Sequence, residues 1–245
     1  MVHSPHTVSE QLRVLIVHAH HEPASFNSAM TKQAVATLIE AGHEVVVSDL
    51  YAMGFDPVSD RRNFSSVADP TRLRQQAEEV VAVAHNGFAP ELQTEIDKLL
   101  WCDVLIFQFP IWWLGLPAIL KGWVDRVFAS GIAYGGGHWF DKGRLLGKRA
   151  MCSLTVGGPE PAYAGDGLYP PISQILLPIH HGIFSFCGFT VIEPFVVYGP
   201  NRISDEERGE ELSRYSTRLL NLDAAPTLPM VRTDDYDGFV RRARA

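Results

Sequence analysis

The stretch LRVLIVHA, at residues 12–19, is an almost unbroken apolar run, and it decides the fold class. Such a run is typical of a central parallel strand whose two faces are both buried. A polar loop follows, and residues 27–40 then have the length and pattern of a helix, with Gly42 where that helix would end. A strand followed at once by a helix is the repeating unit of an α/β protein.

The same alternation continues along the chain. Further strands are predicted at 44–48, 103–109, 149–155 and 188–197, the last interrupted by Pro194. Helices are predicted at 116–128, 171–186 and 205–219. This order predicts a five-stranded parallel sheet with helices on both faces.

Three segments stand outside this pattern. Residues 51–86 are rich in Asp, Arg, Ser and Pro and exceed the length of an ordinary connection, so we expect them to cross an edge of the domain or to reach a partner. Residues 1–10 are predicted to be disordered, and residues 11–220 form the single domain. The tail, 221–245, is expected to be partly disordered or to wrap a partner subunit.

Composition narrows the functional classes. The 245 residues are 46% hydrophobic, which is typical of a globular protein. Their net charge of −7 argues against a protein dedicated to binding nucleic acid. Cys102, Cys152 and Cys187 lie far apart and indicate buried thiols in a reducing compartment. The N-terminus lacks a signal-peptide core, and the apolar stretch 174–198 is broken by prolines, so we expect a cytoplasmic protein without a membrane span.

Ligands of open parallel sheets bind beyond the carboxyl ends of the strands, and the loops at three of these ends are unusual. The loop at 20–27 ends in residues that cap a helix, and a helix start can hold a phosphate. The loop at 110–117 has two adjacent tryptophans, which suit a flat ligand or an interface. The loop at 155–169 has paired glycines, which let the backbone approach a ligand closely, and two tyrosines. Taken alone, this loop would be interpreted as a tight turn with tyrosines on the surface. Together the three loops fit a ribityl flavin.

Other chemistries have less support. Neither a Walker A sequence nor a GxGxxG fingerprint is present, and no nucleophile-elbow triad is visible. His18 alternates within the first strand and is interpreted as a structural histidine. No metal site is expected, because the pair His180 and His181 has no second ligand cluster nearby in the sequence.

At these loops the sequence resembles the NAD(P)H dehydrogenase (quinone) family, which includes the DT-diaphorases. The matching stretches are SFNSAM at 25–30, SDLYAMGFDP at 48–57, FQFPIWWLGLPAILKGWVDRVF at 107–128, DKG at 141–143, TVGG at 155–158 and FCGFTVIEP at 186–194. The resemblance covers residues 13–220. It implies a flavodoxin-like domain that works as a homodimer, with the active site at the subunit interface.

The resemblance also implies roles for individual residues. The flavin diphosphate and ribityl chain are expected near His20, Ser25, Phe26 and Asn27. The isoalloxazine is expected between the loop of Pro110, Ile111, Trp112, Trp113 and Leu114 and the opposite residues Thr155, Gly157, Gly158 and Tyr163. Arg208 falls near the adenine end of FAD, which is favoured over FMN. The expected catalytic residues are Tyr163, Tyr169 and Gly157, and the expected substrate pocket comprises Trp113, Tyr134, Gly136 and Phe186.

The implied reaction is a ping-pong transfer of hydride from NADH or NADPH to a quinone or related electrophile. The sequence departs from the DT-diaphorases at Tyr169, where they have a histidine, and a phenol cannot supply the charge of an imidazolium. It also has Trp112 in place of a glutamine, and Gly136 in place of a tyrosine that caps the pocket from the partner. The alternatives are a regulatory flavoprotein subunit of an ion-efflux system and an electron carrier.

Overall fold

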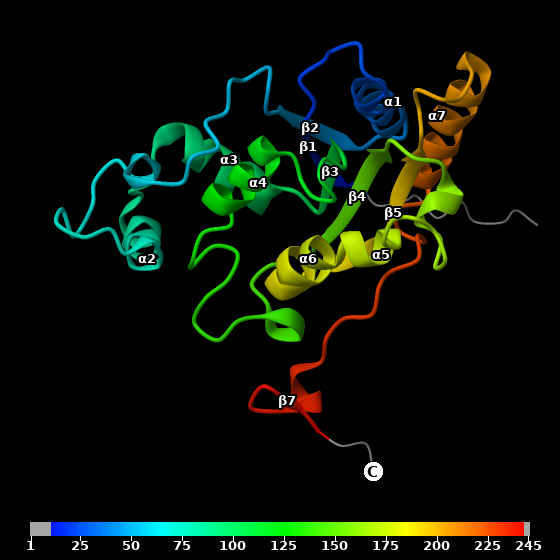
Figure 1. The fold of residues 1–245 in the computed structure, drawn as a ribbon. Helices are drawn as coiled ribbons and strands as arrows, with labels where there is room; N and C mark the ends of the chain where they lie inside the picture. Colours follow the sequence, from blue (N-terminus) through cyan, green and yellow to red (C-terminus); the bar gives the residue numbers. More distant parts are fainter. Residues whose placement is uncertain (1–10, 243–245) are drawn as a thin grey trace, which may run out of the picture.

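Five parallel strands form the central sheet in the order β2-β1-β3-β4-β5 (Figure 1). The strands are β1 (Arg13–His18), β2 (Glu44–Asp49), β3 (Val104–Pro110), β4 (Arg149–Val156) and β5 (Thr190–Tyr198) in a computed structural model that describes residues 11–242. The three central strands are buried almost throughout, which is why their sequences are mostly apolar with few interruptions. The predicted five-stranded parallel sheet is confirmed.

Helices cover both faces of the sheet, and each face has its own core (Figure 1). On one face, α1 (Phe26–Glu40) packs beside α7 (Asp205–Leu220). On the other face lie α3 (Pro90–Trp101), α4 (Ala118–Val127) and a helical segment that comprises α5 (Ile172–Ile175), α6 (Leu177–Ile179) and a π-helical turn, η4 (His180–Ser185). The fold is therefore that of a flavodoxin-like protein, as predicted.

Two helices were not predicted from the sequence, α3 and α2 (Gln75–His85), and α2 lies within the supposedly irregular segment 51–86. The reason is clear for α2, because its buried face carries carboxylates as well as apolar groups. Glu78 accepts hydrogen bonds from the backbone N–H groups of Ala68 and Asp69, and Glu79 accepts one from Ser130. A helix is predicted from the periodic spacing of apolar residues. In α2, carboxylates that accept hydrogen bonds from loop N–H groups stand at inward-facing positions, so the apolar periodicity is lost.

The long segment also packs against its own chain. Gly122 of α4 lies so close to Pro57 that a Cβ atom there would stand 2.3 Å from the Pro57 carbonyl oxygen. Arg126 of the same helix is buried and donates hydrogen bonds to the Asp56 carbonyl oxygen and to Asn63. The segment around Asp56 to Asn63 is thus held by contacts within the chain.

Strand β5 is an edge of the sheet, which is why it tolerates Pro194. The tail covers this edge, because Glu193 and Leu228 form backbone hydrogen bonds with Pro226 and Val191. Beyond it, β6 (Tyr236–Asp237) and β7 (Val240–Arg241) form a hairpin that projects from the body (Figure 1). The start of the tail therefore packs along the edge of its own domain, whereas the segment 1–10, predicted to be disordered, and the last three residues lie outside the described range.

The predicted helix at 171–186 is instead the three-part segment α5, α6 and η4. Pro178 has no N–H to donate, and the chain continues through the π-helical turn. This turn buries the His180 side chain, whose Nε2 finds no hydrogen-bond partner among the described residues.

Between residues 11 and 242, no helix is long and apolar enough to cross a membrane, and no cluster of three or more potential metal-ligating side chains occurs.

We predict that His180 makes the fold sensitive to acid. Burial lowers the pKa of His180 to about 4. The unfolded chain binds a proton near pH 6.5 but the folded chain only near pH 4, so the stabilisation is complete above pH 6.5 and is lost as the pH falls to 4. The loss should be about 3 kcal/mol in the free energy of unfolding. Urea unfolding across this range should show a shallower pH dependence in His180→Phe, and an unchanged one in the exposed-site control His138→Gln. Equal slopes in wild type and His180→Phe would contradict the prediction.

Candidate active site

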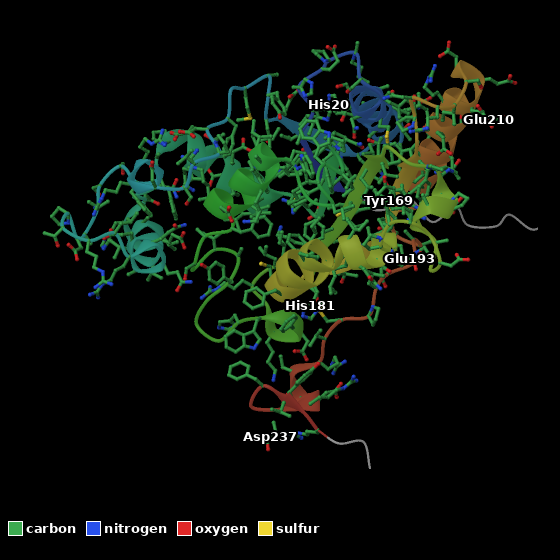
Figure 2. All side chains as sticks on the ribbon, in the orientation of Figure 1. His20, Tyr169, His181, Glu193, Glu210 and Asp237 are labelled. Carbon is green, nitrogen blue, oxygen red and sulfur yellow. The ribbon has the colours of Figure 1, made fainter. Side chains whose placement is uncertain are left out.

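The loops that follow β1, β3 and β4 meet at the carboxyl edge of the sheet, because these strands are neighbours in its order. Figure 2 shows His20 and Tyr169 near the ends of the central strands, and His181 lower down, on the helical segment. The residues predicted to bind a flavin come from these loops. They are therefore brought to one edge by the topology itself.

The loop after β1 ends in a capped helix start. Ser25 is the N-cap of α1, and its Oγ accepts a hydrogen bond from the Ser28 N–H at 3.1 Å, as predicted for a capping role. The Glu22 N–H donates to His20 Nδ1 at 3.0 Å, so the neutral His20 ring carries its proton on Nε2. Burial, and then the neighbouring His21, lower the pKa of His20. His20 is therefore a neutral hydrogen-bond donor beside a helix N-terminus, an arrangement that suits a phosphate.

Beneath these loops lies a buried polar network. Asn27 Nδ2 donates to Thr155 Oγ1 at 2.8 Å, and Gln108 Nε2 donates to Asn27 Oδ1 at 2.9 Å. All three side chains are buried, and they tie α1 to β3 and β4. The predicted ligand residues Asn27 and Thr155 therefore hold the loops in place from below. Likewise His18 is a structural histidine, as predicted, because its ring contacts the hydroxyls of Ser28 and Thr31 at 3.2 and 2.9 Å.

The loop after β3 contains a strained four-residue turn, residues 112–115, which we call the tryptophan turn. The N–H groups of Trp112 and Gly115 donate to each other's carbonyl oxygens, at 3.2 and 3.0 Å. The two central residues, Trp113 and Leu114, have φ values of 52° and 55°. Bulky residues in this left-handed region cost about 1–2 kcal/mol each, and such strain is concentrated at functional sites. The turn leaves the Trp113 side chain fully exposed in the single chain.

The predicted ring-binding residues Pro110 and Ile111 fix the base of this turn. Pro110 is the last residue of β3 and is paired with Thr155 of β4. The Ile111 N–H donates to the Thr155 carbonyl oxygen at 2.9 Å, which extends the ladder by one residue. The tryptophan turn therefore starts from a rigid point beside the glycine loop of β4.

The loop after β4 brings two of the predicted catalytic residues together. The rings of Tyr163 and Tyr169 are stacked, with centroids 5.1 Å apart, and Tyr198 at the end of β5 packs on Tyr163 at 5.9 Å. A Cβ atom on Gly158 would lie 3.1 Å from the Tyr163 ring, so any larger residue there would press on that ring. Burial raises the pKa of Tyr163, which keeps this phenol protonated and able to donate a hydrogen bond. Gly157 is held by Arg202, whose Nε donates to its carbonyl oxygen at 3.0 Å.

A separate cavity of about 630 Å³ lies between the start of α1 and the start of α7. Ser25, Phe26 and Arg208 line it, together with Pro200 and Asn201. Arg208 Nη1 donates to the carbonyl oxygens of Pro200 and Ile203 at 2.9 and 2.7 Å, which fixes the guanidinium at the rim. The predicted adenine-end residue Arg208 therefore adjoins the predicted diphosphate loop.

The predicted substrate-pocket residues are not all brought together within one chain. Tyr134 and Phe186 line a groove of about 580 Å³, to which none of the residues of the tryptophan turn contributes. Gly136 lies between Gly135 and Gly137, and all three have positive φ values, of 66°, 104° and 82° in the order named. A side chain there would be strained, so the glycine run is required by the backbone conformation as well as leaving room. Trp113 thus does not line the groove to which Tyr134 and Phe186 belong.

Some residues at the site were missed by reasoning from the sequence. His21 stacks on His20, with centroids 4.8 Å apart, and also contacts Tyr51 and Trp112 at 5.9 and 5.6 Å. Tyr198 was missed because the carboxyl end of β5 was not considered. The available signal was positional, since Tyr51 lies two residues after β2 and Tyr198 is the last residue of β5.

The fold and these loops define a class, the flavodoxin-like proteins, and a family model described as "Flavodoxin-like fold" matches residues 12–219. The chain is 43% identical to NAD(P)H dehydrogenase (quinone) 1 of Cavia porcellus over 211 residues, which are 86% of this chain and 77% of that protein. It is 37% identical to ribosyldihydronicotinamide dehydrogenase (quinone) of Homo sapiens over 218 residues, 89% of this chain and 94% of that protein.

A solved structure from Klebsiella pneumoniae superimposes with a TM-score of 0.86 at 37% identity, covering 89% of this chain and 88% of that one. The chain therefore belongs to the NAD(P)H dehydrogenase (quinone) family. Membership of this family, which the sequence motifs indicated, is confirmed. The alternative, an ancillary subunit of an ion-efflux system, gains no support from these relatives.

Proposed function

We propose that the protein is a flavin-dependent NAD(P)H:quinone oxidoreductase that binds FAD. The observation that carries the proposal is the pairing of the exposed Trp113, on its strained turn, with the glycine loop that ends at Tyr163. A flat, electron-accepting ring fits between an aromatic wall and an open backbone. The family's names supply the substrate class, since the relatives are dehydrogenases that act on quinones.

The bound flavin would supply hydride transfer from NAD(P)H to the quinone, and the chain's residues supply position and polarity. His20 Nε2 and the start of α1 would hold the diphosphate. The backbone of residues 112–114 and of Gly157 would orient the ring. Tyr163 would hold its phenolic proton against the pyrimidine end, where negative charge gathers on reduction.

The cavity beside Arg208 supports FAD over FMN. It continues from the diphosphate loop at Ser25 and Phe26, and FMN would leave it without an occupant. The deciding experiment is to denature the purified protein, identify the released flavin, and assay NADH and NADPH against benzoquinone and menadione. A colourless protein that cannot be loaded with any flavin would overturn the proposal.

Tyr163→Phe is expected to slow reduction of the flavin by about 10- to 100-fold, because it removes a proton donor that stabilises developing charge. Tyr169→Phe should have a smaller effect, because its ring stacks on Tyr163 and the phenylalanine keeps that contact. Stopped-flow measurement of flavin bleaching by NADH would compare the two. A loss at Tyr169 equal to that at Tyr163 would show instead that the second phenol is a full partner in proton transfer.

We also propose a homodimer whose active site lies at the subunit interface. Trp113 is fully exposed, whereas the other aromatic residues of the substrate pocket, Tyr134 and Phe186, line a groove elsewhere on the same chain. A second copy would bring the two halves together, and the projecting hairpin, with Phe239 92% exposed, would contact that copy.

The free, buried cysteines also support a reducing compartment such as the cytoplasm.

Mixed dimers provide the test. Trp113→Ala and Phe186→Ala should each lower quinone reduction strongly in homodimers. Co-refolded mixtures should recover activity above both parents, because each mixed dimer has one site with both native residues. Absence of recovery in mixtures shown to be dimeric by light scattering would place both residues in a site made by one chain.

A further inference from the structure

Three consecutive glycines, residues 135–137, follow the groove-lining residue Tyr134. The rings of Tyr134 and Phe140 both contact Phe186, the second aromatic residue of the groove, with centroids 6.2 and 5.6 Å away. Along the chain, the glycine run therefore lies between two residues that pack on the wall of the groove. The run itself adds no side chain there, so the group that covers it must come from another part of the chain.

Arg144 covers this glycine run. Its Nε donates a hydrogen bond to the Gly135 carbonyl oxygen at 3.2 Å. Its Nη2 lies 3.4 Å from the position that a Cβ atom on Gly136 would occupy. The guanidinium is thus placed where a side chain of residue 136 would begin. Because Arg144 is exposed, the guanidinium is open to a ligand that approaches from outside.

The charge of Arg144 is not neutralised by a carboxylate. Among residues 11–242, the neighbouring ion pairs join Lys142 to Asp234 at 2.8 Å and Arg232 to Asp141 at 3.4 Å, and no ion pair includes Arg144. These two carboxylates are therefore each paired with another cation. Since a guanidinium is always charged in proteins, the positive charge of Arg144 remains available.

The charged residues that line the groove do not offset this arginine at the surface. Glu79 is only 2% exposed, and it accepts hydrogen bonds from the Ser130 N–H at 2.7 Å and from Gln75 Nε2 at 2.9 Å. Lys121 and Asp125 form an ion pair with each other at 2.6 Å. The unpaired exposed charge beside the groove is therefore a positive one.

We propose that Arg144 is a specificity-determining residue that makes the enzyme favour anionic quinones, those with a sulfonate or carboxylate group on the ring. The inference rests on the proposed function and on the proposed homodimer, in which the groove of one subunit faces the flavin of the other. The aromatic residues of the groove contact the quinone ring, and the guanidinium of Arg144 forms charge-assisted hydrogen bonds with its oxyanion. Neutral quinones use the same groove without this contact.

The test compares naphthoquinone with naphthoquinone sulfonate as acceptors for the flavin-loaded enzyme. The two share a ring system and differ in charge, so the change in their ratio of kcat/KM between variants isolates the charge. In Arg144→Gln the ratio of sulfonate to neutral quinone should fall about threefold to fivefold, the effect of an exposed ion pair, whereas Arg144→Lys should keep most of it. Raising the ionic strength from about 0.05 M to about 0.5 M should move the wild-type ratio toward that of Arg144→Gln.

Direct binding gives a second readout. Calorimetric titration of the oxidised enzyme with naphthoquinone sulfonate should show a Kd about threefold to fivefold higher in Arg144→Gln, with the wild-type amount of bound flavin. The matched control is Arg218→Gln, which removes the same charge from α7, on the opposite face of the sheet, and should leave both measurements unchanged.

The proposal would be overturned by an unchanged ratio in Arg144→Gln, or by an equal fall in Arg218→Gln. A higher KM for NADH with an unchanged ratio would also overturn it, because Arg144 would then bind the nucleotide and not the acceptor. A wild-type protein that lacks flavin, or that reduces neither naphthoquinone, would instead refute the proposed function, so the two failures are distinguishable.

Discussion

Replacing Gly158 by valine is expected to lower kcat/KM for quinone reduction about 100-fold or more. The first added carbon would lie 3.1 Å from Tyr163 and 3.6 Å from Tyr169, which is tighter than an ordinary contact for Tyr163, and valine adds two further methyl groups beside these stacked rings. We expect this crowding to displace the Tyr163 phenol from the flavin ring, and a misplacement of about 1 Å at a reacting centre costs about 10²-fold. Steady-state assays and the ratio of flavin to protein would measure the loss.

Gly165 in the same loop offers the matched control. A Cβ atom there would meet nothing within 4 Å, so Gly165→Val should retain wild-type activity and flavin content. If Gly158→Val and Gly165→Val behaved alike, crowding of Tyr163 by residue 158 would not be the cause of the lost activity. The comparison isolates the close approach of one glycine to one ring from general effects on loop flexibility.

Replacing Gly122 by alanine is expected to destabilise the fold by at least about 3 kcal/mol. The added Cβ would stand 2.3 to 2.5 Å from the oxygen, Cβ and Cα atoms of Pro57, and most of these are backbone or ring atoms that cannot rotate away. The 51–86 segment would have to move away from α4 and weaken the hydrogen bond from Arg126 to the Asp56 carbonyl oxygen. The midpoint of thermal unfolding should fall by about 6–12 °C.

Gly209 provides a control of opposite sign. It lies within α7, where an added Cβ would meet nothing within 4 Å, so Gly209→Ala should raise stability by about 0.5–1 kcal/mol through helix propensity. Chemical denaturation of both variants would measure the difference. An unchanged stability in Gly122→Ala would mean that the segment containing Pro57 does not pack against α4 in solution.

The fold was predictable because the central strands are buried on both faces. Residues 12–19 and 103–109 are nearly unbroken apolar runs, which is the pattern expected of a parallel strand buried on both faces. Helix α2 escaped prediction because Glu78 and Glu79 face inward to bind loop N–H groups, and helical periodicity is read from apolar residues alone. The break at 180–185 also escaped, because a π-helical turn has no distinct sequence pattern.

The candidate site was predictable to the level of its loops. Ligands bind at the carboxyl ends of parallel strands, so the loops after β1, β3 and β4 could be selected without a structure. What each side chain does there was less predictable. Asn27 and Thr155 were expected to touch the flavin, and the structure has them buried and hydrogen-bonded to each other, a contact between residues 128 positions apart.

The sequence by itself determined the α/β class, the loops that form the site and the family, because these depend on local runs and on motifs that are contiguous. Tertiary structure alone decided which distant residues meet. The order β2-β1-β3 brings the rings of Tyr51, His21 and Trp112 together, and the approach of Pro57 leaves no space for a side chain at Gly122. Such contacts depend on strand order and on close packing, which leave no periodic trace in any one segment of the chain.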